Sequence, residues 1–281
     1  MGAPAVGTSQ GRIRLKLVPR FYGAALTKAG RKNASIALRR FVLKQFSELD
    51  VEVDVETRAT ESKSKARAEE EVFLVLSGTD AKVVAGHVSQ AIGVQVRFDD
   101  IDVRRVLRGY LKDVGQQGFG VFVDVGAFSP NKDALLSLRT LRRQLAGDEK
   151  VPARKILEAY GLGEHLPVEV VATKVDVEAG LLEVELSEAQ VEALTSWVAG
   201  SNERVNACGA TRQYLKRQVA KTGHTVDVLR VERLGVLENQ LVLKPGTSAP
   251  GIIAHVGRRL PGVDLYAVHP TAAWDFLGQP S

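Results

Sequence analysis

Two segments that lie far apart in the sequence can be aligned with each other without a gap. This similarity limits the possible folds of the chain more than any other feature of the sequence. The stretch NASIALRRFVLKQFSELDVEVDV (33–55) aligns with NACGATRQYLKRQVAKTGHTVDV (206–228), and Phe41 matches Tyr214. A second match follows in the same order, between VLSGTDAKVVAGHV (75–88) and VLKPGTSAPGIIAHV (242–256), with one inserted residue. Two matches in one order predict an internal duplication, with related units at both ends of the chain.

The first unit has alternating segments around two helical patterns. Apolar and polar residues alternate from Arg12 in RIRLKLV, and again in VEVDVET and VFLVLSG, which predicts strands. A helix is expected over 24–49, and a second begins at a capping Asp80 and runs through Ile92. With a last strand at 94–98, the order is βαββαβ, the ferredoxin-like arrangement. We therefore expect an α+β protein with a ferredoxin-like domain over 12–101, after a flexible segment over 1–11.

The second unit, over 188–270, is expected to be incomplete. The segment ELSEAQVEALT stands where a first strand would be, and it reads as a helix. The predicted order is therefore αββαβ. In the tail over 271–281, Trp274 and Phe276 indicate that this segment docks on the rest of the chain.

The middle of the chain, over 102–187, has a different pattern. Strands are expected at VRRVLRGYLKDVG and FGVFVDVG, and a closing hairpin at LPVEVVATKVDVEAGLLEVELS. DALLSLRTL is either a third strand or the start of a helix, and PARKILEAYGL is a helix with Pro152 near its first turn. The order βββαββ is that of a five-stranded OB barrel.

This middle segment resembles the RNA-binding repeat named after ribosomal protein S-one, an OB-type domain. The matching positions are Gly109, Phe119, Gly120, Phe122, Val123, Asp176 and Leu186–Ser187, with Leu111 at the opening valine. Ser137 stands where the family commonly has a histidine. The whole chain also loosely resembles an uncharacterised family of archaeal proteins with an RxYG-like first strand, here RFYG (20–23).

The resemblance implies that Phe119 and Phe122 stack on RNA bases. Residues three apart face opposite sides of an ideal strand, but the glycine between them permits a bulge that brings both to one face. An aromatic ring accepts any base, at about 1–3 kcal/mol per stacked base. The alternative is that one or both rings fill the barrel.

The charge of the chain indicates a polyanionic partner. The net charge is +5, and basic residues gather on the expected helices. Such side chains contact phosphates, although a single basic helix is more often just a solvated face. The predicted phosphate contacts are Arg31, Lys32, Arg39, Arg40, Lys44, Arg139, Arg142, Arg143, Arg212, Lys216 and Arg217.

Other patterns are absent from the sequence. No apolar run is long enough for a membrane span, and the start of the chain has no secretory pattern, so a cytoplasmic location is expected. The single Cys208 allows no internal disulfide, and the histidines lack metal-site spacing. We expect no catalytic residues, metal, cofactor or small-molecule substrate.

Together these patterns predict a non-enzymatic RNA-binding protein. The resemblance to the ribosomal-protein repeat, together with the three-module shape, implies ribosomal RNA or a ribosomal subunit as the partner, where such a basic protein would regulate or inhibit translation. A protein-interaction or transcription-associated factor remains an alternative, because these folds also dock proteins. A nucleic-acid-processing enzyme is a second alternative, which the scattered carboxylates and histidines do not favour.

Overall fold

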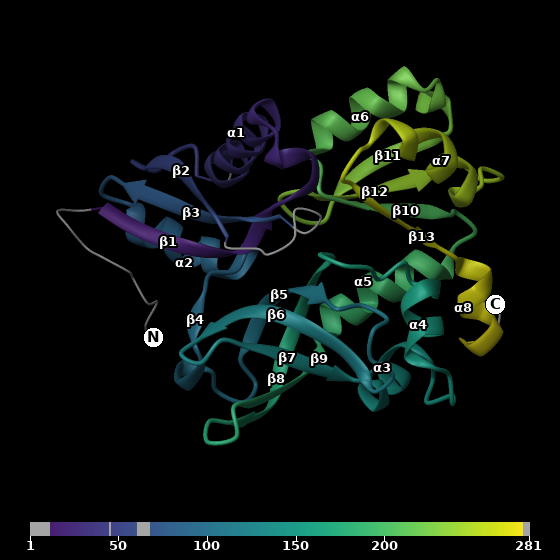
Figure 1. Ribbon diagram of the computed structural model, residues 1–281, viewed down its shortest axis with the longest axis horizontal. Coiled ribbons are helices and arrows are strands. Elements are labelled where there is room, and N and C mark those ends of the chain that lie inside the picture. Colours follow the sequence, from purple (N-terminus) through teal and green to yellow (C-terminus); the bar gives the residue numbers. More distant parts are fainter. Residues whose placement is uncertain (1–11, 45, 61–67, 278–281) are drawn as a thin grey trace.

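The computed structural model describes residues 12–44, 46–60 and 68–277, and the expected segment 1–11 lies outside them. The protein is a mixed α+β structure with three sheets (Figure 1). A three-stranded N-terminal sheet and a four-stranded C-terminal sheet flank a closed barrel of five strands. The alternation and helical periodicity in the sequence therefore predicted the general class.

The N-terminal unit packs its helices on one antiparallel sheet with the order β1-β3-β2. Apolar residues of α1 recur every four positions, at Ala34, Leu38 and Val42, and all three are buried. This spacing places them on one side of the helix, which explains why the other side carries polar and basic residues. The elements are β1 (Arg12–Phe21), α1 (Lys28–Lys44), β2 (Glu52–Ala59), β3 (Glu70–Ser77) and α2 (Ala81–Ala91).

The expected fourth strand of this unit is divided between two sheets, which corrects the prediction for 94–98. Val94 forms a single antiparallel bridge with Leu17 of β1. The next residues, β4 (Val96–Arg97), pair in parallel with the barrel strand β6. Gly126 of β6 permits this close approach, because a Cβ there would lie 3.2 Å from the Cα atom of Gln95, which directly precedes β4, and 2.7 Å from a methyl group of Val18 in β1.

The barrel has the five predicted strands, with two helices instead of one between the third and the fourth, and it closes through the β6–β7 and β7–β9 pairings. Ser137 ends β7 and caps α3 by accepting a 3.2 Å hydrogen bond from the amide of Thr140. The ambiguous segment DALLSLRTL is thus a strand followed by a helix. The elements are β5 (Val106–Lys112), β6 (Gly120–Phe128), β7 (Lys132–Ser137), α3 (Leu138–Leu145), α4 (Ala153–Ala159), β8 (Pro167–Asp176) and β9 (Leu181–Leu186).

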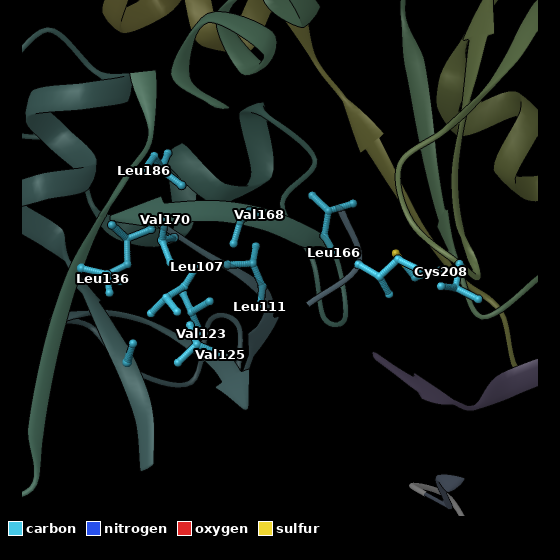
Figure 2. Packing of buried hydrophobic residues seen from close by; sticks show 14 of the residues in the cluster. Leu107, Leu111, Val123, Val125, Leu136, Leu166, Val168, Val170, Leu186 and Cys208 are labelled. Atoms are coloured by element: carbon cyan, nitrogen blue, oxygen red, sulfur yellow. The ribbon is translucent and has the colours of Figure 1, made fainter. Parts of the chain in front are cut away.

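Branched aliphatic side chains fill the barrel. Figure 2 shows Leu107, Leu111, Val123, Leu136 and Val168 gathered among its strands. On β6 the valines 121, 123 and 125 are buried, so the residues between them point outward, as strand alternation requires. One continuous hydrophobic core joins the barrel to the N-terminal unit and includes Leu194, Trp197 and Val198, whereas the C-terminal sheet and the helices over 212–221 and 249–256 have a second core.

The C-terminal unit has a strand between its first two helices, which corrects the predicted αββαβ order. Its first strand, β10 (Arg204–Cys208), lies in the centre of a sheet with the order β11-β12-β10-β13. Both faces of this strand are covered, so its sequence RVNAC lacks the alternation that would have revealed it. The other elements are α5 (Glu188–Ala199), α6 (Arg212–Lys221), β11 (Val228–Arg233), β12 (Glu238–Leu243), α7 (Ala249–Val256) and β13 (Asp264–Val268).

The two units share an order of elements, but the ungapped sequence alignment pairs some residues that lie in different elements of the two units. Asn33 lies in α1, whereas its match Asn206 lies in β10; Phe41 and Tyr214 both lie in helices. Ser248 caps α7 by accepting a hydrogen bond from the amide of Gly251. Asp80 stands at the start of α2 without capping it, because its carboxylate accepts a 2.9 Å hydrogen bond from the amide of Asp50.

The last helix, α8 (Pro270–Leu277), docks on the preceding part of the chain. The indole of Trp274 donates a 2.8 Å hydrogen bond to the carbonyl oxygen of Val198, at the end of α5. The docking of the tail is thus confirmed for residues up to 277. Within the described residues, no helix is both long enough and apolar enough to span a bilayer.

Candidate nucleic-acid interface

A cleft of about 740 Å³ separates α1 from the first part of α6. The two helices lie next to each other at the top of Figure 1, although about 170 residues separate them in sequence. The α1 wall is one stripe of the helix surface, with spacings of three and four residues. It consists of Asn33, Ile36, Ala37, Arg40, Phe41 and Lys44.

Cations dominate the lining of this cleft, which in the described part of the chain includes no carboxylate. None of these cations forms an ion pair with another described residue. Their charges therefore add to a positive potential that favours a polyanion. They are Arg40, Lys44, Arg212, Lys216, Arg217 and Arg233.

Two of these arginines are held in position by contacts other than ion pairs. The Nε of Arg212 donates a 2.8 Å hydrogen bond to the carbonyl oxygen of Val231. The guanidinium carbon of Arg233 lies 5.2 Å from the ring centroid of Phe41, a cation–π contact. Burial lowers the pKa of Arg233, and the nearby charge of Arg212 lowers it further. An anion placed between the two guanidinium groups would relieve this repulsion.

The cleft collects some of the predicted phosphate contacts and leaves out others on α1. Arg40, Lys44, Arg212, Lys216 and Arg217 all line it. Lys32 and Arg39 are exposed, but they lie outside its lining.

Arg31, another predicted phosphate contact, is bound to Glu70 of β3. Its Nε donates a 2.7 Å hydrogen bond to Glu70, and a second bond joins the same two groups. This hydrogen bonding raises the pKa of Arg31. A guanidinium group that is bound to a carboxylate is a poor contact for a phosphate. The sequence could not show this ion pair, because Glu70 lies two elements after α1 in the chain.

The arginines of α3 form no comparable cluster. Arg142 donates a 2.8 Å hydrogen bond to the carbonyl oxygen of Val151, and Arg143 pairs with Glu185. Arg139 is exposed. The predicted third basic group is therefore largely engaged within the barrel domain.

Phe119 and Phe122 lie together outside the barrel. Their ring centroids are 6.1 Å apart and their planes are nearly perpendicular, and Phe119 is 53% exposed. Phe119 precedes β6, and Gly120 follows it where a Cβ would lie 2.4 Å from the carbonyl oxygen of Leu136. Only glycine at position 120 therefore allows the chain to pass this close to β7. Neither phenylalanine side chain fills the interior of the barrel.

Sequence reasoning missed Arg233, Phe41 and Tyr214 as members of the cleft. Arg233 is the last residue of β11 and belongs to no basic helix. The sequence did contain a hint that the two aromatic residues are related, because Phe41 and Tyr214 align with each other in the internal repeat. In the part of the chain that the structure covers, no group of three or more His, Cys, Asp and Glu side chains is arranged to hold a metal ion.

Comparison with protein families places the barrel and the C-terminal unit in one family. The model of the DUF2110 central domain matches residues 101–198, and that of the DUF2110 C-terminal domain matches residues 202–268. Together they cover more than half of the 281 residues. The chain belongs to the DUF2110 family. In this DUF2110 protein, the C-terminal domain supplies four cations of the cleft, and α1, which precedes the matched ranges, supplies the other two.

Other comparisons add little. No curated protein matches the DUF2110 chain. Among solved structures, it is similar to a chain of the a/eIF2alpha–aDim2p–rRNA complex from Pyrococcus horikoshii OT3, with 17% identity and a TM-score of 0.24. The match covers 43% of the DUF2110 chain and 63% of that chain, which is less than two thirds of its length.

Proposed function

We propose that this DUF2110 protein is a non-enzymatic RNA-binding protein that holds the RNA backbone in the cleft between α1 and α6. The observation that carries the proposal is the group of six cations on a cleft whose described lining has no carboxylate. Arginine and lysine in this arrangement bind phosphates by charge and by charge-assisted hydrogen bonds.

The aromatic pair on the barrel supports RNA as the polyanion. Phe119 and Phe122 lie on the outer surface, where bases can reach the exposed ring of Phe119. The resemblance of this strand to the S-one type repeat implies the same role. The barrel thus adds contacts to bases, while the cleft contacts the backbone.

The partner that we propose is structured RNA of the translation machinery. A basic protein with separate contact surfaces on the barrel and on α1–α6 suits a large folded RNA better than a short free strand. Bound to a ribosomal particle, it would act as a regulatory or inhibitory factor. Sedimentation of a crosslinked cell extract tests this step: we expect the protein in ribosomal fractions, and migration with polymerase or alone would contradict it.

The flanking units support a further structural proposal, that both descend from one ferredoxin-like unit. The C-terminal sheet has its first strand in the centre and its fourth at the edge. In the N-terminal unit, Val94 makes its bridge on the corresponding side of β1. The cleft would then lie between equivalent helices of the two copies.

Charge substitutions test the proposed RNA binding. Arg40→Gln, Lys44→Gln, Lys216→Gln and Arg217→Gln together remove four exposed cations of the cleft. The control is Lys32→Gln with Arg39→Gln, which removes exposed cations of α1 outside the lining. In a fluorescence polarisation assay, we expect the cleft variant to lose at least about tenfold in RNA affinity and the control much less. Equal affinities for the two variants would refute the assignment of the cleft.

A further inference from the structure

Two aromatic side chains face the same cleft from opposite walls. Phe41 of α1 and Tyr214 of α6 both belong to its lining, and both are half-buried. Each packs its inner side against the core of its own unit. The cleft therefore offers apolar, planar surface between its cations, which binding of phosphate alone does not require.

Arg233 adds a third planar group beside Phe41. The guanidinium group lies over the face of the phenyl ring, and it forms no ion pair within 4 Å with a described carboxylate. A guanidinium plane, like an aromatic ring, is a surface on which an RNA base can stack. Because the ring of Phe41 already supports Arg233, less side-chain freedom is lost when a base arrives.

The size of the cleft limits what can enter it. A volume of about 740 Å³ lies in the range of sites for small molecules of drug size, about 300–1,000 Å³. A short run of unpaired nucleotides fits such a volume. In a duplex the bases are paired and stacked inside, so only phosphates at its edge would reach the cations.

We propose that the α1–α6 cleft is a site for single-stranded RNA, in which Phe41 of α1, the guanidinium group of Arg233 that lies over its ring, and Tyr214 of α6 stack on bases. This inference rests on the proposed RNA-binding function and names the ligand class of the same site. The flanking cations contact phosphates of the strand, and the aromatic groups distinguish a base-bearing strand from other polyanions. Stacking of one base corresponds to an affinity gain of about 5- to 150-fold.

The test compares three probes of equal phosphate number: a single-stranded RNA, the same strand without bases, and an RNA duplex. The variants are Phe41→Leu and Tyr214→Leu, which keep an apolar side chain for the core. The control is Phe46→Leu, because Phe46 packs on His87 and lies outside the cleft lining. Thermal unfolding of each variant shows whether the fold is retained.

We expect the wild type to prefer the single strand to the baseless strand by at least about fivefold. Each cleft variant should reduce that preference severalfold while binding the baseless strand as the wild type does, and Phe46→Leu should change neither. An unchanged preference in both cleft variants, or an equal loss for both strands, would overturn the inference. The proposed function fails separately, if the four-cation variant binds all three probes as tightly as the wild type.

Discussion

The hydroxyl group of Tyr22 donates a 2.7 Å hydrogen bond to the carboxyl group of Glu238 in β12. Tyr22 directly follows β1, so this bond joins the N-terminal unit to the C-terminal unit. The ring of Tyr22 also stacks on His165 of the barrel domain, with ring centroids 4.0 Å apart. All three parts of the molecule therefore meet at one residue.

The first prediction concerns the pH dependence of stability. Burial raises the pKa of Glu238 from 4.5 to about 7, although hydrogen bonds from Tyr22 and from the amide of Leu237 oppose the shift. Between these two pH values the folded protein holds a proton that the unfolded chain has released. The free energy of unfolding should therefore fall as pH rises from about 4.5 to about 7, by about 3 kcal/mol, and this contribution should level off above pH 7.

Glu238→Gln isolates this contribution, because the amide does not titrate. Urea denaturation at several pH values between 5 and 8 should show a smaller loss of stability in the variant than in the wild type. Other titrating groups contribute equally to both proteins, so the difference between the two profiles reports on Glu238. Parallel profiles would mean that Glu238 does not take up a proton in this range.

The second prediction concerns the glycine contact between the flanking units. At Gly23, with φ +57°, a Cβ would lie 2.2 Å from the carbonyl oxygen of Gly262. Gly246, with φ +82°, has no atom within 4 Å of such a Cβ. Gly246→Ala should therefore cost only the backbone strain, about 1 kcal/mol, and Gly23→Ala should cost distinctly more because backbone must move.

Denaturation of both glycine variants measures this difference, and RNA binding gives a second measurement. Because Gly23 precedes α1 and contacts the C-terminal unit, Gly23→Ala should also weaken RNA binding in the cleft. Equal destabilisation by the two substitutions would show that the units do not approach as closely as described.

The third prediction concerns Phe119. Its ring is 53% exposed, so Phe119→Ala should change the free energy of unfolding by less than about 1 kcal/mol. Binding of single-stranded RNA should weaken by about 1–3 kcal/mol if a base stacks on the ring. A titration with labelled RNA and a urea melt measure the two effects. A stable variant with unchanged affinity would show that bases do not use this surface.

The sequence predicted best where one face of an element is solvated. The valines of β6 and the periodic apolar residues of α1 gave patterns that the structure follows. Strand β10 was missed because both its faces are covered, and β4 was misplaced because nothing in its residues shows which sheet they join. The sequence identified five cations of the cleft as predicted phosphate contacts, but it showed them only as members of separate basic helices. Their meeting in one cleft, and the engagement of Arg31 by Glu70, depend on contacts between distant segments.

The salt dependence of RNA binding shows whether the cations of the cleft hold RNA by its phosphates. Each phosphate contact with single-stranded RNA contributes about 0.7 to the slope of log affinity against log salt concentration. The wild type should have a steep negative slope. The variant with Arg40→Gln, Lys44→Gln, Lys216→Gln and Arg217→Gln should have a slope shallower by about 2–3, while Lys32→Gln with Arg39→Gln retains nearly the wild-type slope. A flat slope for the wild type, or the same slope for all three proteins, would contradict the account.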